Sequence, residues 1–239
     1  MEAWLMEIAN GFTKAFITGD RWKLYLKGLG VTLELTVIAL ALGVILGVLV
    51  AVIRTAHDQQ RPGHRNPLLG VLNALCKVYT TVIRGTPMMV QLLIWSSVIF
   101  ASSRNHTLIG AFGIGINSGA YVAEIVRGGL MSVDGGQMEA GRSLGLGYLD
   151  TMRLIVVPQA FKNILPALGN EFVTLVKETS VAGYIGLRDL TKASDIVASR
   201  TYDYFVPLIL AACVYLVIVL GLTKLVRMFE RRLAQSDYR

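Results

Sequence analysis

The sequence carries little charge for its length. Only 16% of its 239 residues are charged, whereas soluble globular domains carry roughly 25%. Hydrophobic residues make up 54% of the chain, and the mean hydropathy is +0.56. Residues 35–53 and 204–223 contain no charged residue, and each run approaches the roughly 20 residues that a helix needs to cross a bilayer. The scarcity of charge excludes an ordinary soluble domain and predicts a protein with several membrane spans.

Cysteine and the common catalytic patterns are scarce as well. Cys76 and Cys213 are isolated within or beside apolar segments, so they predict neither a disulfide framework nor a metal site. The sequence lacks the glycine-rich phosphate loop G-x-x-x-x-G-K-[ST], and no nucleophile is paired with a base in a recognisable pattern. We therefore expect a chain that is not an enzyme and holds no cofactor or metal. Any energy from ATP must come from another chain.

The apolar segments predict an all-α membrane protein with five spanning helices. The third is rich in glycine, and the fourth contains Pro158 and Pro166. Small residues and prolines are tolerated where helices pack closely or line a path, since the protein itself shields the polar groups there. We place the spans at 28–53, 74–101, 108–131, 153–177 and 204–225.

Two shorter segments flank the predicted membrane domain, which covers 28–228. In residues 1–27 large apolar residues recur every four positions, at Trp4, Ile8, Phe12 and Phe16, which predicts a short helix at the membrane interface. A disordered tail is the alternative. Residues 229–239 are expected to form a cytoplasmic tail.

The distribution of basic residues predicts the orientation. Lys and Arg concentrate around the first and third connections and in the C-terminal tail, and such residues tend to stay in the cytoplasm. The N-terminus is therefore expected outside and the C-terminus in the cytoplasm, although Lys14, Arg21, Lys23 and Lys27 favour the opposite orientation. This bias accounts for the net charge of +7 without a nucleic-acid partner.

The most specific pattern lies in the third connection, at 134–158. Glu139-Ala140-Gly141 is followed by three residues, Gly145, nine residues and then IVVP at 155–158. The pattern resembles the "EAA" loop of ABC importer permeases, which is Glu-Ala-Ala, three residues, Gly, nine residues and Ile-x-Leu-Pro. The spacing matches throughout, while Gly141 replaces the second Ala and Val157 replaces Leu.

The loop has the features that a coupling element needs. We expect Gly135 and Gly136 to end the third span, residues 137–143 to form a short helix, and Gly145 and Gly147 to permit a sharp turn. In the family this helix sits in a groove of the ATP-binding subunit, and small residues at Ala140 and Gly141 would let it sit deeply. An ordinary amphipathic loop helix is the alternative. The resemblance implies these coupling residues: Gln137, Glu139, Ala140, Gly141, Ser143, Leu144, Gly145 and Gly147.

Three further stretches resemble the permeases for polar amino acids, the histidine, glutamine, glutamate and arginine importers. They are VIRGTPMMVQLLIW at 82–95, NSGAYVAEIVRGG at 117–129 and NEFVTLVKETSVAGYIGLRDL at 170–190. The resemblance implies the type I importer permease (MetI-like) fold in a bacterial cytoplasmic membrane. It also implies a second permease subunit, identical or homologous, two ATP-binding cassette subunits that hold ATP and magnesium, and an extracytoplasmic amino-acid-binding protein.

Polar residues on the third and fourth spans predict a substrate path, because charges within a bilayer are costly and usually functional. Their helical spacing gives two polar stripes, which could line an aqueous cavity for an amino acid. The alternative is structural: Glu124 would hold helices together, and Lys177 would pair with a nearby Glu. The stripes comprise Asn117, Tyr121 and Glu124 on the third span, and Asn170, Glu171, Thr174, Lys177 and Glu178 on the fourth.

The second span is expected to break at residues 84–87. Pro87 cannot donate a backbone hydrogen bond and disfavours helix in Thr86 before it. The break could form a gate or substrate contact through Arg84 and Thr86, or a kink with Arg84 reaching toward the cytoplasmic face.

An ion-coupled transporter or channel, with the intramembrane acids and Lys177 as a relay, is the alternative to an ATP-driven importer. The sequence does not identify the amino acid.

Overall fold

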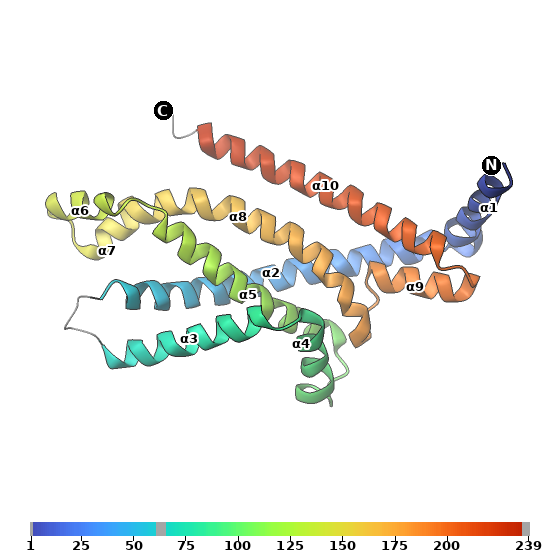
Figure 1. Cartoon of the computed structure of the whole chain (residues 1–239), viewed down its shortest axis with the longest axis horizontal. Coiled ribbons are helices and arrows are strands. Elements are labelled where there is room, and N and C mark those ends of the chain that lie inside the picture. Colours follow the sequence, from blue (N-terminus) through green and yellow to red (C-terminus); the bar gives the residue numbers. More distant parts are fainter. Residues whose placement is uncertain (1, 61–65, 236–239) are drawn as a thin grey trace. The chain divides into compact units, whose positions relative to one another are not determined.

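The computed structural model describes residues 2–60 and 66–235, and throughout this part of the chain the elements are helical, with no strand. The predicted all-α fold is confirmed. The α-helices along the chain (Figure 1) are α1 Glu2–Phe12, α2 Trp22–Asp58, α3 Pro67–Gly85, α4 Met88–Ile94, α5 His106–Met131, α6 Gly135–Ser143, α7 Tyr148–Thr151, α8 Val157–Glu178, α9 Leu190–Thr201 and α10 Phe205–Gln235. Short π or 3₁₀ turns occupy Thr13–Ile17, Thr18–Asp20, Trp95–Ile99, Met152–Val156 and Thr179–Ile185.

Three of the five predicted spans coincide with single helices suited to a bilayer, and the second predicted span coincides with a bent pair of helices. In the described residues α2, α5 and α10 are long and apolar enough to cross a membrane, and α3 with the α4 region qualifies if the bent pair counts as one span. The fourth predicted span is helical from Met152 to Glu178, but it does not meet that criterion. A fifth span therefore stays a prediction.

The break in the second span lies where the sequence places it. α3 ends at Gly85, and Thr86 is extended, with φ −119° and ψ 145°. Pro87 is extended too and immediately precedes α4. The ring of Pro87 disfavours helical backbone in Thr86, which explains why the helix stops there.

The chain forms two compact units, each assembled from three stretches of sequence. Unit 1 comprises 1–39, 87–114 and 173–222, and unit 2 comprises 40–86, 115–172 and 223–239. One buried cluster of unit 1 joins the N-terminal segment, α2, α9 and α10 through Ala15, Tyr25, Leu190, Val197, Val206 and Ala211. The predicted N-terminal helix is present as α1, although α2 already begins at Trp22.

Glycine allows the helices of unit 2 to approach closely. A Cβ atom at Gly47 on α2 would lie 2.6 Å from Val122 on α5, and one at Gly129 on α5 would lie 2.3 Å from Ile164 on α8. Real side chains do not approach that closely, so only glycine permits these contacts. The glycine-rich third span thus packs tightly against its neighbours, as expected of small residues at helix interfaces.

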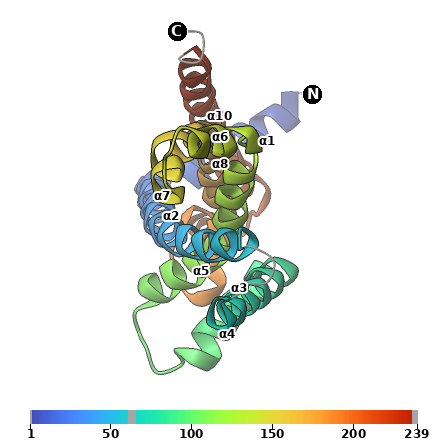
Figure 2. The ribbon, with the colours of Figure 1, turned by 90° about the vertical axis from the view of Figure 1, so that its left-hand side faces the viewer.

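The short helices of unit 2 lie beside the C-terminal end of α2. There α2 runs alongside α3, and α6 and α7 lie together at the same end of the unit (Figures 1 and 2). The Tyr148 hydroxyl of α7 donates a hydrogen bond to the Gln59 side chain, which directly follows α2. The predicted coupling segment is therefore attached to the C-terminal end of α2.

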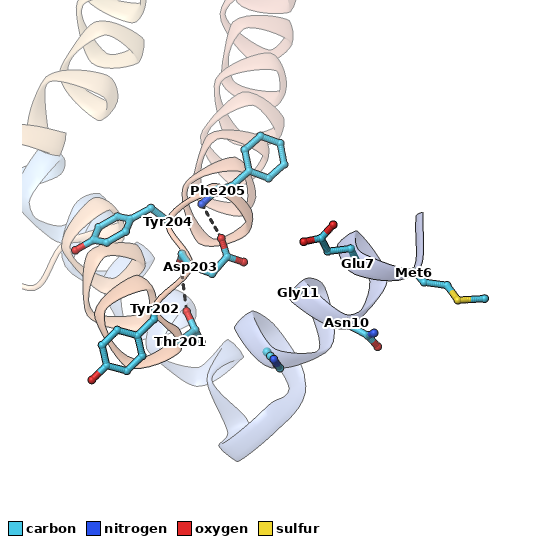
Figure 3. A pocket seen from close by; sticks show the side chains of 10 residues that line it. Met6, Glu7, Asn10, Gly11, Thr201, Tyr202, Asp203, Tyr204 and Phe205 are labelled. Atoms are coloured by element: carbon cyan, nitrogen blue, oxygen red, sulfur yellow. Dashed lines mark hydrogen bonds between the residues drawn. The ribbon is translucent and has the colours of Figure 1, made fainter. Parts of the chain in front are cut away.

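Unit 1 has an open hollow of about 950 Å³ beside α1. Figure 3 shows residues of α1 on one side and the connection between α9 and α10, from Thr201 to Phe205, on the other. Tyr202 in this connection has a φ of 54° and a side chain that is 95% exposed. The Asp203 carboxylate accepts a hydrogen bond of 2.9 Å from the Phe205 backbone, which fixes the start of α10.

Candidate functional site

α6 is a short helix with a defined cap at its start. The Asp134 carboxylate accepts a hydrogen bond of 2.6 Å from the backbone N–H of Gly136, which satisfies one of the free donors at the helix start. α6 therefore begins at Gly135, and α5 already ends at Met131. The expectation that Gly135 and Gly136 end the third span was wrong, because Asp134 makes them the first turn of the short helix.

The turn after α6 depends on glycine at one position. Gly145 has a φ of +84°, in the left-handed region, which costs other residues roughly 1–2 kcal/mol. Gly147 has a φ of −66° and is the N-cap of α7. Of these two glycines, only Gly145 has a backbone conformation that requires glycine.

Gly141 packs against its own chain. It is buried, and a Cβ atom there would lie 2.5 Å from Thr151 Cγ2 and 3.1 Å from Ile155 Cδ1. Its small size therefore lets α6 lie close to α7 and the following turn. Gly141 is thus covered by its own chain, and the expectation that its small size fits a partner's groove does not hold.

A second face of α6 is open to solvent. Gln137, Ala140, Ser143 and Leu144 are exposed, and Leu144 is 81% exposed. Leu149 on α7 is 77% exposed. Two large apolar side chains in a short polar segment favour a surface that another protein covers.

The third face of α6 lines a cavity of about 450 Å³ within unit 2. Met138, Glu139 and Arg142 contribute from α6, and Thr55 contributes from α2. Tyr148 also lines it, and partial burial raises the pKa of its phenol. Glu139 lines this cavity and is at the same time exposed to solvent.

Glu124 forms ion pairs inside unit 2. Its carboxylate accepts a hydrogen bond from Arg54 of α2, and Arg127 lies 3.4 Å away on the next turn of α5. Arg127 also lies 3.9 Å from Asp58. These pairs support the structural alternative, in which Glu124 joins α5 to α2. The sequence analysis did not predict Arg54 as the partner of Glu124. The one signal for it was that Arg54 directly follows an apolar run.

Glu171 and Asn117 are buried, at 9% and 3% exposure. The Ser118 hydroxyl of α5 donates a hydrogen bond of 2.9 Å to the Glu171 carboxylate of α8. Ser118 was not predicted, since a serine beside Asn117 gives no signal of its own. Asn170, next to Glu171, is exposed.

The remaining path candidates are dispersed. Thr174 and Glu178 are half-buried and Lys177 is exposed, all three in unit 1. None of the path candidates lines the cavity beside α6 or the hollow beside α1.

The residues at the break form local contacts. The Arg84 guanidinium lies 5.3 Å from the centre of the Tyr121 ring, within the range of a cation–π contact. The Thr86 hydroxyl donates a hydrogen bond of 2.9 Å to the Val82 carbonyl at the end of α3. These contacts stabilise the kink and favour that interpretation over a gate. Within residues 2–60 and 66–235, no three His, Cys, Asp or Glu side chains are placed to hold a metal.

Comparison with known proteins gives consistent matches. Residues 67–235 match the family described as "Binding-protein-dependent transport system inner membrane component". The chain is 36% identical to the "Putative glutamine transport system permease protein GlnP" of Rickettsia bellii, covering 88% of this chain and 93% of that protein. It is 35% identical to the "Arginine transport system permease protein ArtQ" of Bacillus subtilis, over 89% of this chain and 93% of the relative.

Solved structures agree with these matches. A chain of the "Crystal structure of an amino acid ABC transporter with histidines" is 42% identical, with a TM-score of 0.79, over 88% of this chain and 94% of that chain. The inward-facing MetNI methionine ABC transporter gives a TM-score of 0.68 at 20% identity, over 93% of this chain and 100% of that chain. At that identity the second likeness concerns the fold alone.

Proposed function

This chain belongs to the binding-protein-dependent transport system inner membrane components, and from that premise we propose that α6 couples it to ATP-binding subunits that drive import of a polar amino acid. It is a multi-pass permease subunit of an amino-acid ABC importer, not an enzyme, and a partner hydrolyses the ATP. We further propose which residues couple the chain to its partner, the assembly in which they act and the substrate that is imported.

The observation that carries the coupling proposal is that α6 packs on its own chain through one buried residue, Gly141, and leaves most of its surface open. The cavity-lining residues Glu139 and Arg142 are exposed as well. In our proposal the open face, with Gln137, Ala140, Ser143 and Leu144, contacts the ATP-binding subunit. Gly141 and Gly145 fix the geometry of the segment, so that motion of the partner passes through α7 and α8 to the membrane domain.

The proposed assembly contains two permease subunits, identical or homologous, on two ATP-binding subunits that hold ATP and magnesium. An extracytoplasmic amino-acid-binding protein delivers the substrate. We place the N-terminus outside and the C-terminus in the cytoplasm, because Lys and Arg concentrate around α6 and in the C-terminal part of α10. Residues 1–27 would then lie at the outer interface, 28–228 would form the membrane domain, and 229–239 would be cytoplasmic.

ATP binding would bring the two ATP-binding subunits together, and the coupling helices would transmit that closure so that the path opens outward. Hydrolysis would reset the path to face inward. The relatives named for glutamine and arginine transport support a polar amino acid as the substrate. Of the path candidates, Glu171 and Glu178 are the residues we assign to substrate recognition, while Glu124 serves the structure.

The experiment is reconstitution of the chain with its ATP-binding subunit and binding protein in proteoliposomes. Ala140→Arg, on the open face, should abolish the ATPase activity that the loaded binding protein stimulates, while the permease still inserts. Ala56→Arg, at an exposed position on α2, is the matched control and should keep it. Normal stimulated ATPase activity in Ala140→Arg would rule out docking at this face.

Uptake should be measured with labelled arginine, histidine, glutamine and glutamate in competition. If Glu178 contacts the substrate, Glu178→Gln should weaken uptake of a basic amino acid by about 10-fold or more, the order expected from losing one charged hydrogen bond. Melting temperature should change little. A lower melting temperature with unchanged substrate preference would instead assign Glu178 to the structure.

A further inference from the structure

The C-terminal end of α2 is joined to three other helices of unit 2. The Nδ1 atom of His57 lies 3.0 Å from the side-chain amide nitrogen of Asn73 on α3, which runs alongside this end of α2 (Figure 1). Asp58 lies 3.9 Å from Arg127 on α5, and the residue after Asp58 accepts a hydrogen bond from Tyr148 on α7. Three consecutive residues therefore contact three different helices, so a change at one contact can reach the others.

The contact between His57 and Asn73 requires a neutral imidazole. The amide nitrogen of Asn73 can only donate, so His57 Nδ1 must accept, and an accepting ring nitrogen carries no proton. Asn73 is 4% exposed, and its Oδ1 atom is buried with no hydrogen-bond partner among residues 2–60 and 66–235. A buried amide that lost its contact with His57 as well would be costly. Asn73 thus favours the uncharged ring.

Asp58 competes for the same ring nitrogen. Its Oδ1 atom lies 3.3 Å from His57 Nδ1, and both atoms are acceptors while the ring is neutral. Protonation makes Nδ1 a donor, which can then form a charge-assisted hydrogen bond to the carboxylate. The same proton removes the acceptor that the Asn73 amide nitrogen uses, so the amide must turn or move away. The proton on His57 therefore decides whether Nδ1 accepts from Asn73 or donates to Asp58.

The state of Asp58 affects α5 through Arg127. Arg127 lies about one turn before the end of α5, the helix that leads into α6. When Asp58 pairs with a protonated His57, its charge is neutralised and its attraction for Arg127 falls. Arg54 and Glu124 still join the two helices, but the link through Asp58 is weaker.

Other charged and titratable side chains adjoin this junction in the part of the chain that the structure describes. They are Arg54 on α2, Cys76 and Lys77 on α3, Glu124 and Arg127 on α5, and Tyr148 on α7. A nearby carboxylate favours a protonated ring, whereas nearby lysine and arginine side chains oppose it. Histidine is the side chain that ordinarily exchanges its proton between about pH 5 and pH 8, so a change of pH in this range can switch the ring between its two contacts.

We propose that His57 is a pH sensor that controls how firmly α5 is held beside α2. The unprotonated ring binds Asn73 and leaves Asp58 with Arg127, so that α2, α3 and α5 together support the coupling segment. On acidification the ring takes up a proton, pairs with Asp58 and releases Asn73, and α5 is held less firmly. Acidification of the cytoplasm then lowers transport. The cytoplasmic location and the role of α6 rest on the proposed function.

Hydrogen–deuterium exchange measures this change directly. The whole complex in nanodiscs is compared at about pH 6 and about pH 8, with His57→Gln as the variant that can accept a hydrogen bond but takes up no proton. At the lower pH the backbone amides of residues 127–133 should exchange about two- to fivefold faster in the wild type, the change expected from losing one exposed ion pair. At the higher pH the two should be equal. Comparison at the same pH cancels the intrinsic dependence of exchange on pH.

Two further variants accompany this measurement. His106→Gln removes an exposed imidazole from unit 1 and should behave like the wild type at both pH values. Asp58→Asn removes the carboxylate itself. Its residues 127–133 should exchange faster than those of the wild type at about pH 8 and at the same rate at about pH 6, because protonated His57 has then already drawn Asp58 from Arg127.

The ATPase activity that the loaded binding protein stimulates gives the functional measurement. From about pH 8 to about pH 6 the ratio of wild-type to His57→Gln activity should fall about two- to fivefold. The ratio removes the pH dependence of the ATP-binding subunit, which both complexes share. His57→Lys, whose ammonium group stays charged throughout this range, should have the lower activity at both pH values.

Two results would overturn the proposal. One is equal exchange of residues 127–133 in the wild type and His57→Gln at about pH 6, since His57 would then not control α5. The other is a ratio of wild-type to His57→Gln ATPase activity that stays constant with pH, since the switch would then not affect transport. If the loaded binding protein does not stimulate the ATPase at any pH, the proposed function is contradicted instead, and the exchange measurement still decides whether His57 controls α5.

Discussion

Arg54 on α2 donates a hydrogen bond to the carboxylate of Glu124 on α5, so two apolar helices of unit 2 are joined by an ion pair. The Arg54 side chain is 11% exposed and that of Glu124 is 24% exposed. Removal of one partner from such a pair leaves the other charge poorly solvated, which is more costly than the pair itself is stabilising.

Glu124→Gln should therefore lower the stability of the permease while leaving its choice of substrate unchanged. We expect a loss of about 1.5–3 kcal/mol, the range for a hydrogen bond to a charged group. The measurement is the melting temperature of the purified complex, together with competition between amino acids during uptake. Glu34→Gln removes the same charge from an exposed position on α2 and should change neither. If the variant's preference among amino acids changes while its melting temperature does not, Glu124 belongs to the substrate path.

Gly141→Ala should disrupt the coupling segment from within. The added Cβ would lie 2.5 Å from Thr151 Cγ2, so α6 must move away from α7. We expect reduced stimulated ATPase activity with normal membrane insertion. Gly135→Ala, where the Cβ meets nothing within 4 Å, is the control in the same helix. Adding Thr151→Ser removes the Cγ2 methyl and should restore part of the activity; if it does not, the clash is not the cause.

Gly145→Ala should weaken the turn after α6 through the backbone alone. Its φ of +84° is unfavourable for alanine by roughly 1–2 kcal/mol, although no neighbouring atom lies within 4 Å of the added Cβ. Gly147→Ala, at a φ of −66°, should cost less. Proteolysis of the connection under native conditions measures the difference. Equal susceptibility of the two variants would show that this conformation does not limit the turn.

The sequence allowed prediction of the helices and of the coupling segment, because both depend on local signals. Runs without charge placed α2 and α10, and Pro87 placed the break after α3. The partners of polar residues could not be predicted in the same way. Glu124 has the same helical spacing whether it faces a path or Arg54, and only the tertiary contact distinguishes the two.

The contacts of Gly141 show the same limit. A small residue in a loop helix suits a partner's groove as well as a close contact within the chain, and only the positions of Thr151 and Ile155 favour the second. Exposure is equally hard to predict. Ser194 lies in a connection between predicted spans, yet it is completely buried. The face of α9 that carries Ser194 packs against the rest of unit 1.

Orientation can be tested with single cysteines after replacement of Cys76 and Cys213. Asp150→Cys, exposed on α7, should react in intact cells only with a reagent that crosses the membrane. Ser199→Cys, exposed on α9, should also react with an impermeant reagent. The reverse pattern would place α6 outside the cell, where no ATP-binding subunit could reach it. If both cysteine variants react equally with the impermeant reagent, the cells are leaky. Labelling of a cytoplasmic enzyme by the same reagent is the control that detects such leakage.

The last prediction concerns Asp189, which caps α9 and is completely buried in unit 1. Burial raises the pKa of its carboxyl, and hydrogen bonds from the backbone of Thr191 and Lys192 offset part of that shift. A carboxyl with a higher pKa in the folded protein binds its proton more tightly when folded. Its contribution to stability is therefore fully present below the pKa of unfolded Asp, about 3.9, and is lost as pH rises through the folded pKa.

Acidification toward that window should thus raise the melting temperature of the wild type relative to Asp189→Asn, whose side chain can still cap a helix but carries no titrating proton. Asp189→Ser, a second neutral cap, should behave like the Asn variant. Melting curves of the purified complex at several pH values between neutrality and mild acid provide the measurement. If the wild type instead loses stability relative to both variants as pH falls, the hydrogen bonds from Thr191 and Lys192 outweigh burial, and the folded carboxyl has a lowered pKa.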